Sequence, residues 1–473
     1  MFGLRSTVLI IGAAVAVLGC SGPTVPVVAQ EVAAPKASAA TTASPDFDGD
    51  GTADLVYGVG TTRSFVAVAY GSGRNQNIYR TDAGGTDPAS DDNTMGFGQG
   101  VLARELNGDA YTDLVVVDTS QGAGSAIYFV FGSADGLQPG QAKHYPVPSG
   151  FYGFHGTPAL LESPGRLLVV PVWAPAQVAK GGAVMAYQLG VDGLPNDAVR
   201  VLSQKSLPGT DEVGDAFGAS VAASGNLLVI GIPGEDIGEV QRAGAVLALR
   251  YLGGLEFAGT TITQNTRGVT GKAERWDAFG QSVAIADGYV AISVPGEDLT
   301  KRDAGAVHVF TVSNGNLKHV SRVSQETKRV PGKSEKGDQF GYSVAIIRTC
   351  DGMPGLLVGA PDEAIGSVMM AGSAWVVPLE RHGDDCSLQL YEGGRLGGQA
   401  KEWARVGAVV SSLRAAQIGH SDTLVLTAPG MSEEGLYGRV ITQAAPFSGN
   451  AVIAAKDLIL NDEGTLSISP PAG

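Results

Sequence analysis

Charged residues are scarce in this sequence, and Lys and Arg form no basic run. The 473 residues include 32 Lys and Arg against 47 Asp and Glu, so the formal net charge is −15. Proteins that bind nucleic acids need clustered Lys and Arg to neutralise phosphates. The composition therefore argues against a nucleic-acid partner and favours cations as small partners.

The blocks of Leu, Glu, Lys and Arg that are typical of helical bundles and coiled coils are also missing. The 68 glycines follow no Gly-X-Y period, which excludes a collagen-like fibre. Hydrophobic residues make up 44% of the chain, so it can bury a core and is not expected to be disordered. Many short strands joined by glycine-rich turns fit this composition best.

Catalytic motifs are missing as well. The sequence has no Gly-x-Ser-x-Gly, no His-Glu-x-x-His and no P-loop, and its six histidines are scattered along the chain. We therefore expect a protein that is not an enzyme.

The N-terminus carries an apolar run, from Val8 to Leu18, that is too short to cross a bilayer as a helix. The pattern is typical of a signal peptide, which we place at residues 1–20. The run ends in Val17-Leu18-Gly19-Cys20, which resembles the bacterial lipobox. This resemblance implies cleavage before Cys20 and lipidation of that residue, and the alternative is an ordinary cleavage site after Ala29.

Residues 21–45 are rich in Ala, Pro, Ser, Thr and Val and carry almost no charge. That composition is typical of an extended tether rather than a packed element. We therefore expect an exported protein that is either lipid-anchored on the outer side of the cytoplasmic membrane or secreted. The N-terminal lipid would be its only contact with the membrane.

Cysteine is rare, with three residues in the whole chain. If Cys20 carries lipid, Cys350 and Cys386 remain as an even pair in an oxidising compartment, and we predict a disulfide between them. The alternative is that both are unpaired, buried and serve as small hydrophobic residues.

One sequence unit recurs about every 60 residues, which indicates a repeat architecture. Three clear copies occupy residues 202–222, 262–284 and 323–345, each beginning close to a glutamine: Gln204, Gln264 and Gln325. Weaker copies begin at Met95, Tyr152 and Ala404, and a partial copy begins at Asp46. The chain therefore holds seven units over residues 46–469, followed by a tail at 470–473.

Each unit contains four short strands, and a four-stranded sheet of this size cannot bury both faces alone. We predict that seven such units stack radially into a β-propeller, an all-β fold of antiparallel four-stranded blades. The first unit lacks its innermost strand. The segment from Thr465 to Ser469 alternates apolar and polar residues, so we predict that it completes the first blade and closes the ring.

Phe-Gly pairs recur at Phe97, Phe217, Phe279 and Phe340, and Gly-x-Pro or Ala-Pro turns follow them. This pattern resembles the FG-GAP repeats of the integrin α-subunit N-terminal propeller and its bacterial relatives. The resemblance extends over residues 46–469 and implies a calcium-binding propeller that acts in surface binding or adhesion. Glycine suits inner strands that crowd near a propeller axis, whereas generic turn punctuation does not explain the period.

Two acidic loops are candidate metal sites. In the first, carboxylates or a backbone carbonyl stand at loop positions 1, 3, 5, 7 and 9, and the residues are Asp46, Asp48, Asp50, Thr52 and Asp54. Oxygen ligands at this density suit Ca²⁺, which would also offset the repulsion between the carboxylates. The loop is not an EF-hand because Tyr57 takes the place of the bidentate Glu, and it resembles the β-hairpin calcium loops of integrin α repeats.

The second loop keeps the spacing with weaker ligands. Its corresponding residues are Glu105, Asn107, Asp109, Tyr111 and Asp113, and Ala110 stands where glycine is preferred. We expect weaker calcium binding there. The hairpins of later units carry too few carboxylates for a metal cage and are expected to be plain turns.

Two Pro-Gly-Glu-Asp loops offer a further candidate surface. Glu235, Asp236, Glu297 and Asp298 would form an acidic ligand rim, and the alternative is that they are ordinary solvated turn acids. Our leading functional expectation is a monomeric, calcium-stabilised propeller that binds an unknown protein or glycan outside the cell. An envelope hydrolase acting on a lipid, glycan or phosphoester, and a structural envelope lipoprotein, are the alternatives.

Overall fold

The computed structural model describes residues 44–59, 64–86, 96–120, 124–313, 315–380, 386–415, 420–429, 439–443, 456–460 and 466–469. The predicted signal peptide, the lipidation site Cys20 and the tether up to residue 43 lie outside these residues. No helix in the described part of the chain is long and apolar enough to cross a membrane.

Residues Thr42–Gly473 form one compact unit built from seven antiparallel sheets. The first three blades contain β1 (Leu55–Val59), β2 (Phe65–Ala69) and β3 (Asn75–Tyr79); β4 (Phe97–Arg104), β5 (Asp113–Asp118), β6 (Ala126–Val130) and β7 (Lys143–Pro146); and β8 (Gly153–Phe154), β9 (Ala159–Leu161), β10 (Leu167–Trp173), β11 (Ala183–Leu189) and β12 (Pro195–Leu202). In the third blade β8 and β9 share one position, because both pair with β10.

The next three blades are regular and four-stranded. They contain β13 (Ser220–Ser224), β14 (Leu227–Ile232), β15 (Ala245–Gly253) and β16 (Glu256–Ile262); β17 (Val283–Ala286), β18 (Tyr289–Val294), β19 (Ala306–Ser313) and β20 (Asn316–Val323); and β21 (Ser343–Arg348), β22 (Pro354–Ala360), β23 (Ser373–Pro378) and β24 (Leu388–Leu390). The seventh contains β25 (Val410–Leu413), β26 (Thr423–Ala428), β27 (Arg439–Gln443), β28 (Lys456–Leu460) and β29 (Leu466–Ser469).

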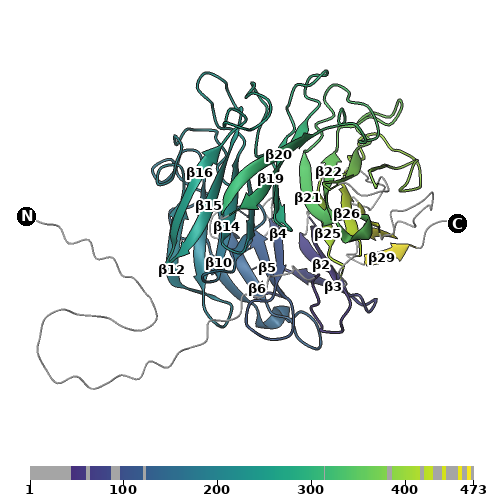
Figure 1. Cartoon of the computed structure of the whole chain (residues 1–473). Helices are drawn as coiled ribbons and strands as arrows, with labels where there is room; N and C mark the ends of the chain where they lie inside the picture. The colour runs from purple at the N-terminus through teal and green to yellow at the C-terminus, as the bar shows by residue number, and fades with distance from the viewer. Residues whose placement is uncertain are drawn as a thin grey trace, which may run out of the picture. The chain divides into compact units, whose positions relative to one another are not determined.

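This arrangement is the predicted seven-bladed β-propeller, and the strands of each blade lie side by side in chain order (Figure 1). Each blade has two ends. We call the end that carries the hairpins between first and second strands the lower face, and the end that carries the loops between second and third strands the upper face. The second metal loop is such a lower-face hairpin, and the first, which precedes β1, lies beside it, where the N–H of Thr112 donates to the Asp46 carbonyl. Both Pro-Gly-Glu-Asp loops lie on the upper face.

The core lies between neighbouring blades, where apolar strand faces meet. Between the fourth and fifth blades, for example, Val229 and Val246 share a cluster with Ile292 and the fully buried Phe279. Burial of about 25 cal/mol per Å² of apolar surface makes these interfaces the main source of stability. Each blade is therefore stabilised by its neighbours, as the repeat pattern predicts.

The Phe-Gly pair has a packing reason that the structure makes explicit. Gly280 has φ +92°, a conformation that favours glycine, and its carbonyl oxygen lies against Gly231 of the preceding blade. A Cβ atom built on Gly231 would come within 2.0 Å of that oxygen. Gly359 and Gly407 repeat the contact between the sixth and seventh blades at the same distance. These glycines allow the chain that leads into one innermost strand to approach the second strand of the preceding blade backbone to backbone.

The predicted ring closure is wrong. The C-terminal strand β29 does not complete the first blade, which keeps three strands; it pairs with β28 as the fifth strand of the seventh blade. Because the connection between β28 and β29 is short, forming a local hairpin costs little chain entropy. Pairing with the first blade would require β29 to cross to another sheet. Among the side chains described, Leu55 of the first blade packs with Val425 and Val440 of the seventh.

Candidate functional site

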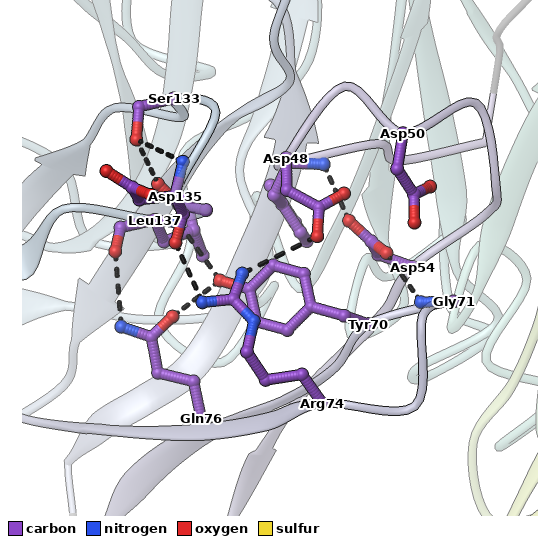
Figure 2. Close-up of polar contacts among 12 residues, drawn as sticks. Asp48, Asp50, Asp54, Tyr70, Gly71, Arg74, Gln76, Ser133, Asp135 and Leu137 are labelled. Atoms are coloured by element: carbon purple, nitrogen blue, oxygen red, sulfur yellow. Dashed lines mark hydrogen bonds and ion pairs between the residues drawn. The ribbon is translucent and has the colours of Figure 1, made fainter.

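The first acidic loop gathers three of its predicted ligands. Asp46, Asp48 and Asp50 precede β1, and one carboxylate oxygen from each lies within 4.8 Å of the other two. Gly51 has φ +82°, so the chain turns sharply directly after Asp50. Figure 2 shows Asp48 and Asp50 on the same loop, with Asp54 beneath them.

Hydrogen bonds within the loop leave part of this oxygen cluster without donors. The backbone N–H of Gly51 donates to Asp46 Oδ2 at 3.0 Å, and that of Thr52 donates to Asp50 Oδ1 at 2.7 Å. Asp46 Oδ1 and Asp48 Oδ1 are buried and accept no hydrogen bond from any described group. Buried anionic oxygens without partners are costly, and a hard cation is the partner that this donor set suits.

Asp54 has a different position from the other three aspartates. It is fully buried, and its carboxylate accepts the backbone N–H of Phe47 at 2.6 Å and that of Gly71 at 2.8 Å. Burial raises the pKa of Asp54 to about 6. Both of its oxygens thus hold the acidic loop against the turn that follows β2. Thr52 contributes a hydroxyl that donates to Asp50.

Arg74 is a neighbour of this site that the sequence pattern did not indicate. Its guanidinium lies 3.5 Å from Asp48 Oδ2 and 3.9 Å from the ring centre of Tyr70, and it donates to the carbonyl of Asp135 at 2.7 Å (Figure 2). Because the arginine is about half exposed, it neutralises Asp48 only weakly. It stands beside the cluster of three carboxylates rather than within it.

The second loop is arranged differently, because its polar groups satisfy one another. The Asn107 side chain donates to Asp109 at 2.9 Å, and the Tyr111 N–H donates to the other Asp109 oxygen at 2.7 Å. Arg166, from the hairpin between β9 and β10, pairs with Glu105 at 3.2 Å and also donates to the Glu105 carbonyl. This loop therefore holds its arginine more closely than the first loop holds Arg74, because Arg166 also donates to two backbone carbonyls of the loop.

Position 9 has the same role in both loops. Asp113 is fully buried and accepts the N–H groups of Leu106 at 2.8 Å and Gly132 at 2.9 Å, as Asp54 does with Phe47 and Gly71. Burial raises the pKa of Asp113 to about 6. In the seventh blade Asp422 is also buried and accepts backbone N–H groups. The aspartate is thus a structural part of the hairpin, with or without other carboxylates.

The predicted acidic rim is wrong for its two glutamates, which are neither rim residues nor solvated. Glu235 is 6% exposed and Glu297 4%, and each accepts a hydrogen bond from a buried glutamine that follows the outer strand of the preceding blade, Gln204 or Gln264. The Gln264 donor lies 2.5 Å from Glu297. The Pro-Gly turn directs these glutamates inward, whereas Asp236 and Asp298 remain exposed.

A buried aspartate accompanies each of these glutamates. Asp215 and Asp277 lie before the inner strands of the fourth and fifth blades, and burial raises the pKa of each to about 7. The sixth blade has the same arrangement, in which burial and the neighbouring Asp338 raise the pKa of Glu363 to about 8. The repeated glutamines of the sequence therefore mark buried polar clusters between blades.

Cys350 and Cys386 form a disulfide, with their Cα atoms 6.2 Å apart. Cys350 lies in the turn between β21 and β22, and Cys386 lies two residues before β24 begins. The pairing is the one that the cysteine count predicts. It links the inner hairpin of the sixth blade to its outermost strand.

Comparisons with known proteins identify the repeat. The FG-GAP repeat matches residues 204–247 and 271–310, which lie in the fourth and fifth blades. No curated protein matches the chain.

Two solved structures are among those similar to this one. A candidate 6-phosphogluconolactonase from Bacteroides uniformis is 11% identical with a TM-score of 0.43, and the match covers 88% of this chain and 94% of that one. A candidate 6-phosphogluconolactonase from Bacteroides fragilis is 10% identical with a TM-score of 0.42, and the match covers 88% of this chain and 93% of that one.

Proposed function

We propose that this FG-GAP propeller is a calcium-stabilised binding module that acts outside the cytoplasm, with a protein or glycan as its partner. The observation that carries the calcium part is the cluster of Asp46, Asp48 and Asp50, in which two buried oxygens lack any described donor. Calcium takes six to eight oxygen ligands in flexible geometry, which fits a loop of this kind. Asp46, Asp48 and Asp50 would hold the ion.

The ion's contribution would be structural. The acidic loop of the first blade contacts the second blade, where the N–H of Thr112 donates to the Asp46 carbonyl at 2.9 Å. Neutralising the three carboxylates would therefore stabilise the loop and the junction between these two blades. A binding module needs such rigidity because ordering a surface on association costs affinity.

Calcium binding is tested by thermal unfolding in excess calcium and in EDTA. A ligand present at 100 times its Kd stabilises the folded state by about 2.7 kcal/mol. We expect calcium to raise the Tm of the wild type and Asp50→Ala to remove most of that rise. Asp109→Ala is the matched variant in the second loop and should remove less of it, because Arg166 already pairs with Glu105 there. An unchanged calcium response in Asp50→Ala would contradict the first site.

The binding role is tested by cross-linking capture from envelope fractions with residues 21–473, in calcium and in EDTA. We expect a stable partner whose capture depends on calcium. Turnover of a substrate without a stable partner would instead support a hydrolase. The proposed anchor is tested separately, because Cys20→Ala should release the protein from membranes.

A further inference from the structure

Three of the four tryptophans are half-exposed on the upper face of the propeller. Trp173, Trp276 and Trp403 are 53%, 50% and 54% exposed, whereas Trp375 is fully buried. Trp173 ends the second strand of its blade, and the other two lie in loops that lead into inner strands. Exposed tryptophan is costly in water, and it is enriched where proteins bind partners.

Trp276 occupies a turn that does not favour a side chain. Its φ is +72°, in the left-handed region, and the equivalent turns of the fourth and sixth blades carry glycine, Gly214 with φ +102° and Gly337 with φ +85°. Glycine adopts this conformation freely, whereas a bulky residue is strained there. The turn itself therefore does not explain the indole, and strain of this kind is often found at functional sites.

Beside the Trp276 indole lies a cleft of about 380 Å³ between the fourth and fifth blades. That volume falls in the range of small-molecule sites, about 300–1,000 Å³. Polar side chains line much of the remaining wall: Glu212, Asp215, Asp236, Gln241 and Arg242. All except Asp215 are exposed.

The walls of the cleft are tied together across the two blades. The N–H of Trp276 donates to the Gln241 carbonyl at 3.1 Å, and the N–H of Arg242 donates to Asp236 Oδ1 at 2.8 Å. The Arg242 guanidinium lies over the Trp276 ring, 4.7 Å from its centre. Stacking on an aromatic ring restrains an arginine and directs its N–H groups sideways. The donors and acceptors of the cleft are thus positioned before any ligand arrives.

We propose that this cleft binds a neutral sugar residue of a glycan, an inference that rests on the proposed binding function and names its ligand class. Glu212, Asp215 and Asp236 outnumber the guanidinium groups of Arg242 and Arg275, which both lie near the Trp276 ring, so the cleft does not favour phosphate or sulfate groups. Carboxylates accept hydrogen bonds from neighbouring hydroxyls, and Arg242 and Gln241 donate to hydroxyl or ring oxygens. Arg242 lies over the indole, so the C–H face of a sugar ring would pack against the part of the half-exposed ring that the guanidinium leaves open.

The test is titration of the full-length protein with neutral hexasaccharides of glucose, mannose, galactose and N-acetylglucosamine, followed by calorimetry and tryptophan fluorescence. The main variant is Trp276→Gly, which introduces the residue that the equivalent turns carry. It should fold as well as the wild type, since it relieves the strained backbone, and a Tm at or above that of the wild type checks this. Trp403→Gly is the matched control, because Trp403 has φ +64° in the same turn of the seventh blade.

We expect at least one of these sugars to bind the wild type and Trp403→Gly equally, and Trp276→Gly to bind it at least tenfold more weakly. Arg242→Ala should also weaken binding at least tenfold. Failure of every sugar to bind, or equal binding by Trp276→Gly, would overturn the inference. Calcium-dependent capture of a protein by Trp276→Gly would then still support the proposed function, so the two failures are distinguishable.

Discussion

Removing the disulfide of the sixth blade is expected to destabilise the protein mainly in that blade. Cys350 and Cys386 are 36 residues apart in the sequence. The bond closes this loop and so reduces the number of conformations that the unfolded chain can adopt. The chain-entropy relation gives about 4 kcal/mol for a loop of this length at 25 °C. The double variant Cys350→Ala/Cys386→Ala should therefore lose about 4 kcal/mol of unfolding free energy.

Alanine is the suitable replacement because Cys386 is only 4% exposed, and a serine hydroxyl would be buried there. Cys350 and Cys386 also line a cavity of about 220 Å³, and replacing both cysteines with alanine enlarges it. The free energy lost through this enlargement adds to the entropic cost. The measured loss is thus expected to equal or exceed the value from chain entropy.

The assay is guanidinium unfolding of the oxidised wild type, the reduced wild type and the double variant, together with amide hydrogen exchange. Reduction alone should reproduce most of the loss without enlarging the cavity. Exchange should accelerate most in β21 to β24, the strands that the bond links. A loss below 1 kcal/mol, or acceleration spread equally over all blades, would refute the reasoning.

Two further predictions concern the contacts between blades. Burial raises the pKa of Asp277 to about 7. The stability that its protonated form contributes is therefore fully present below the unfolded pKa of 3.8 and is lost as the pH rises through 7. Denaturation measured from pH 5 to 9 should show a decline in unfolding free energy, and Asp277→Asn should reduce that decline by about 2 kcal/mol. Gly231→Ala should cost about 3 kcal/mol, because its Cβ would lie 2.0 Å from the Gly280 carbonyl oxygen. Gly140→Ala, whose Cβ meets nothing within 4 Å, is the control, and an equal loss in both variants would refute the packing argument.

The repeat period predicted the number of blades, and four strands in the second, fourth, fifth and sixth blades, because the turn and glycine signals recur along the chain. The cysteine count, together with the expected export, predicted the pairing of Cys350 with Cys386. The partner of the C-terminal strand was not predictable in this way. Alternation identifies Leu466–Ser469 as a strand, but its pairing depends on which free sheet edge lies closest, and that edge belongs to β28.

The wrong prediction that Glu235 and Glu297 form an exposed rim has a similar cause. Pro-Gly-Glu-Asp has the composition of a solvated turn, and the burial of Glu235 depends on Gln204, which follows the outer strand of the preceding blade. Gln204 and Glu235 belong to the same sequence unit but come from neighbouring blades, and the sequence alone does not show that these two loops meet. The sequence analysis did not single out Trp276, because only a comparison of equivalent turns shows that it stands where two other blades have glycine.

The placement of β29 makes this propeller thermodynamically closer to a linear array than to a closed circle. Among the described strands, no ladder joins the first and seventh blades, because β29 pairs with β28 and the sheet of the first blade contains β1, β2 and β3. In a nearest-neighbour description, the end blades then open first and the middle blades last. Asp46, Asp48 and Asp50 belong to one of those end blades. An ion held there would act as a terminal cap, raising the cost of fraying at the end where unfolding would otherwise begin.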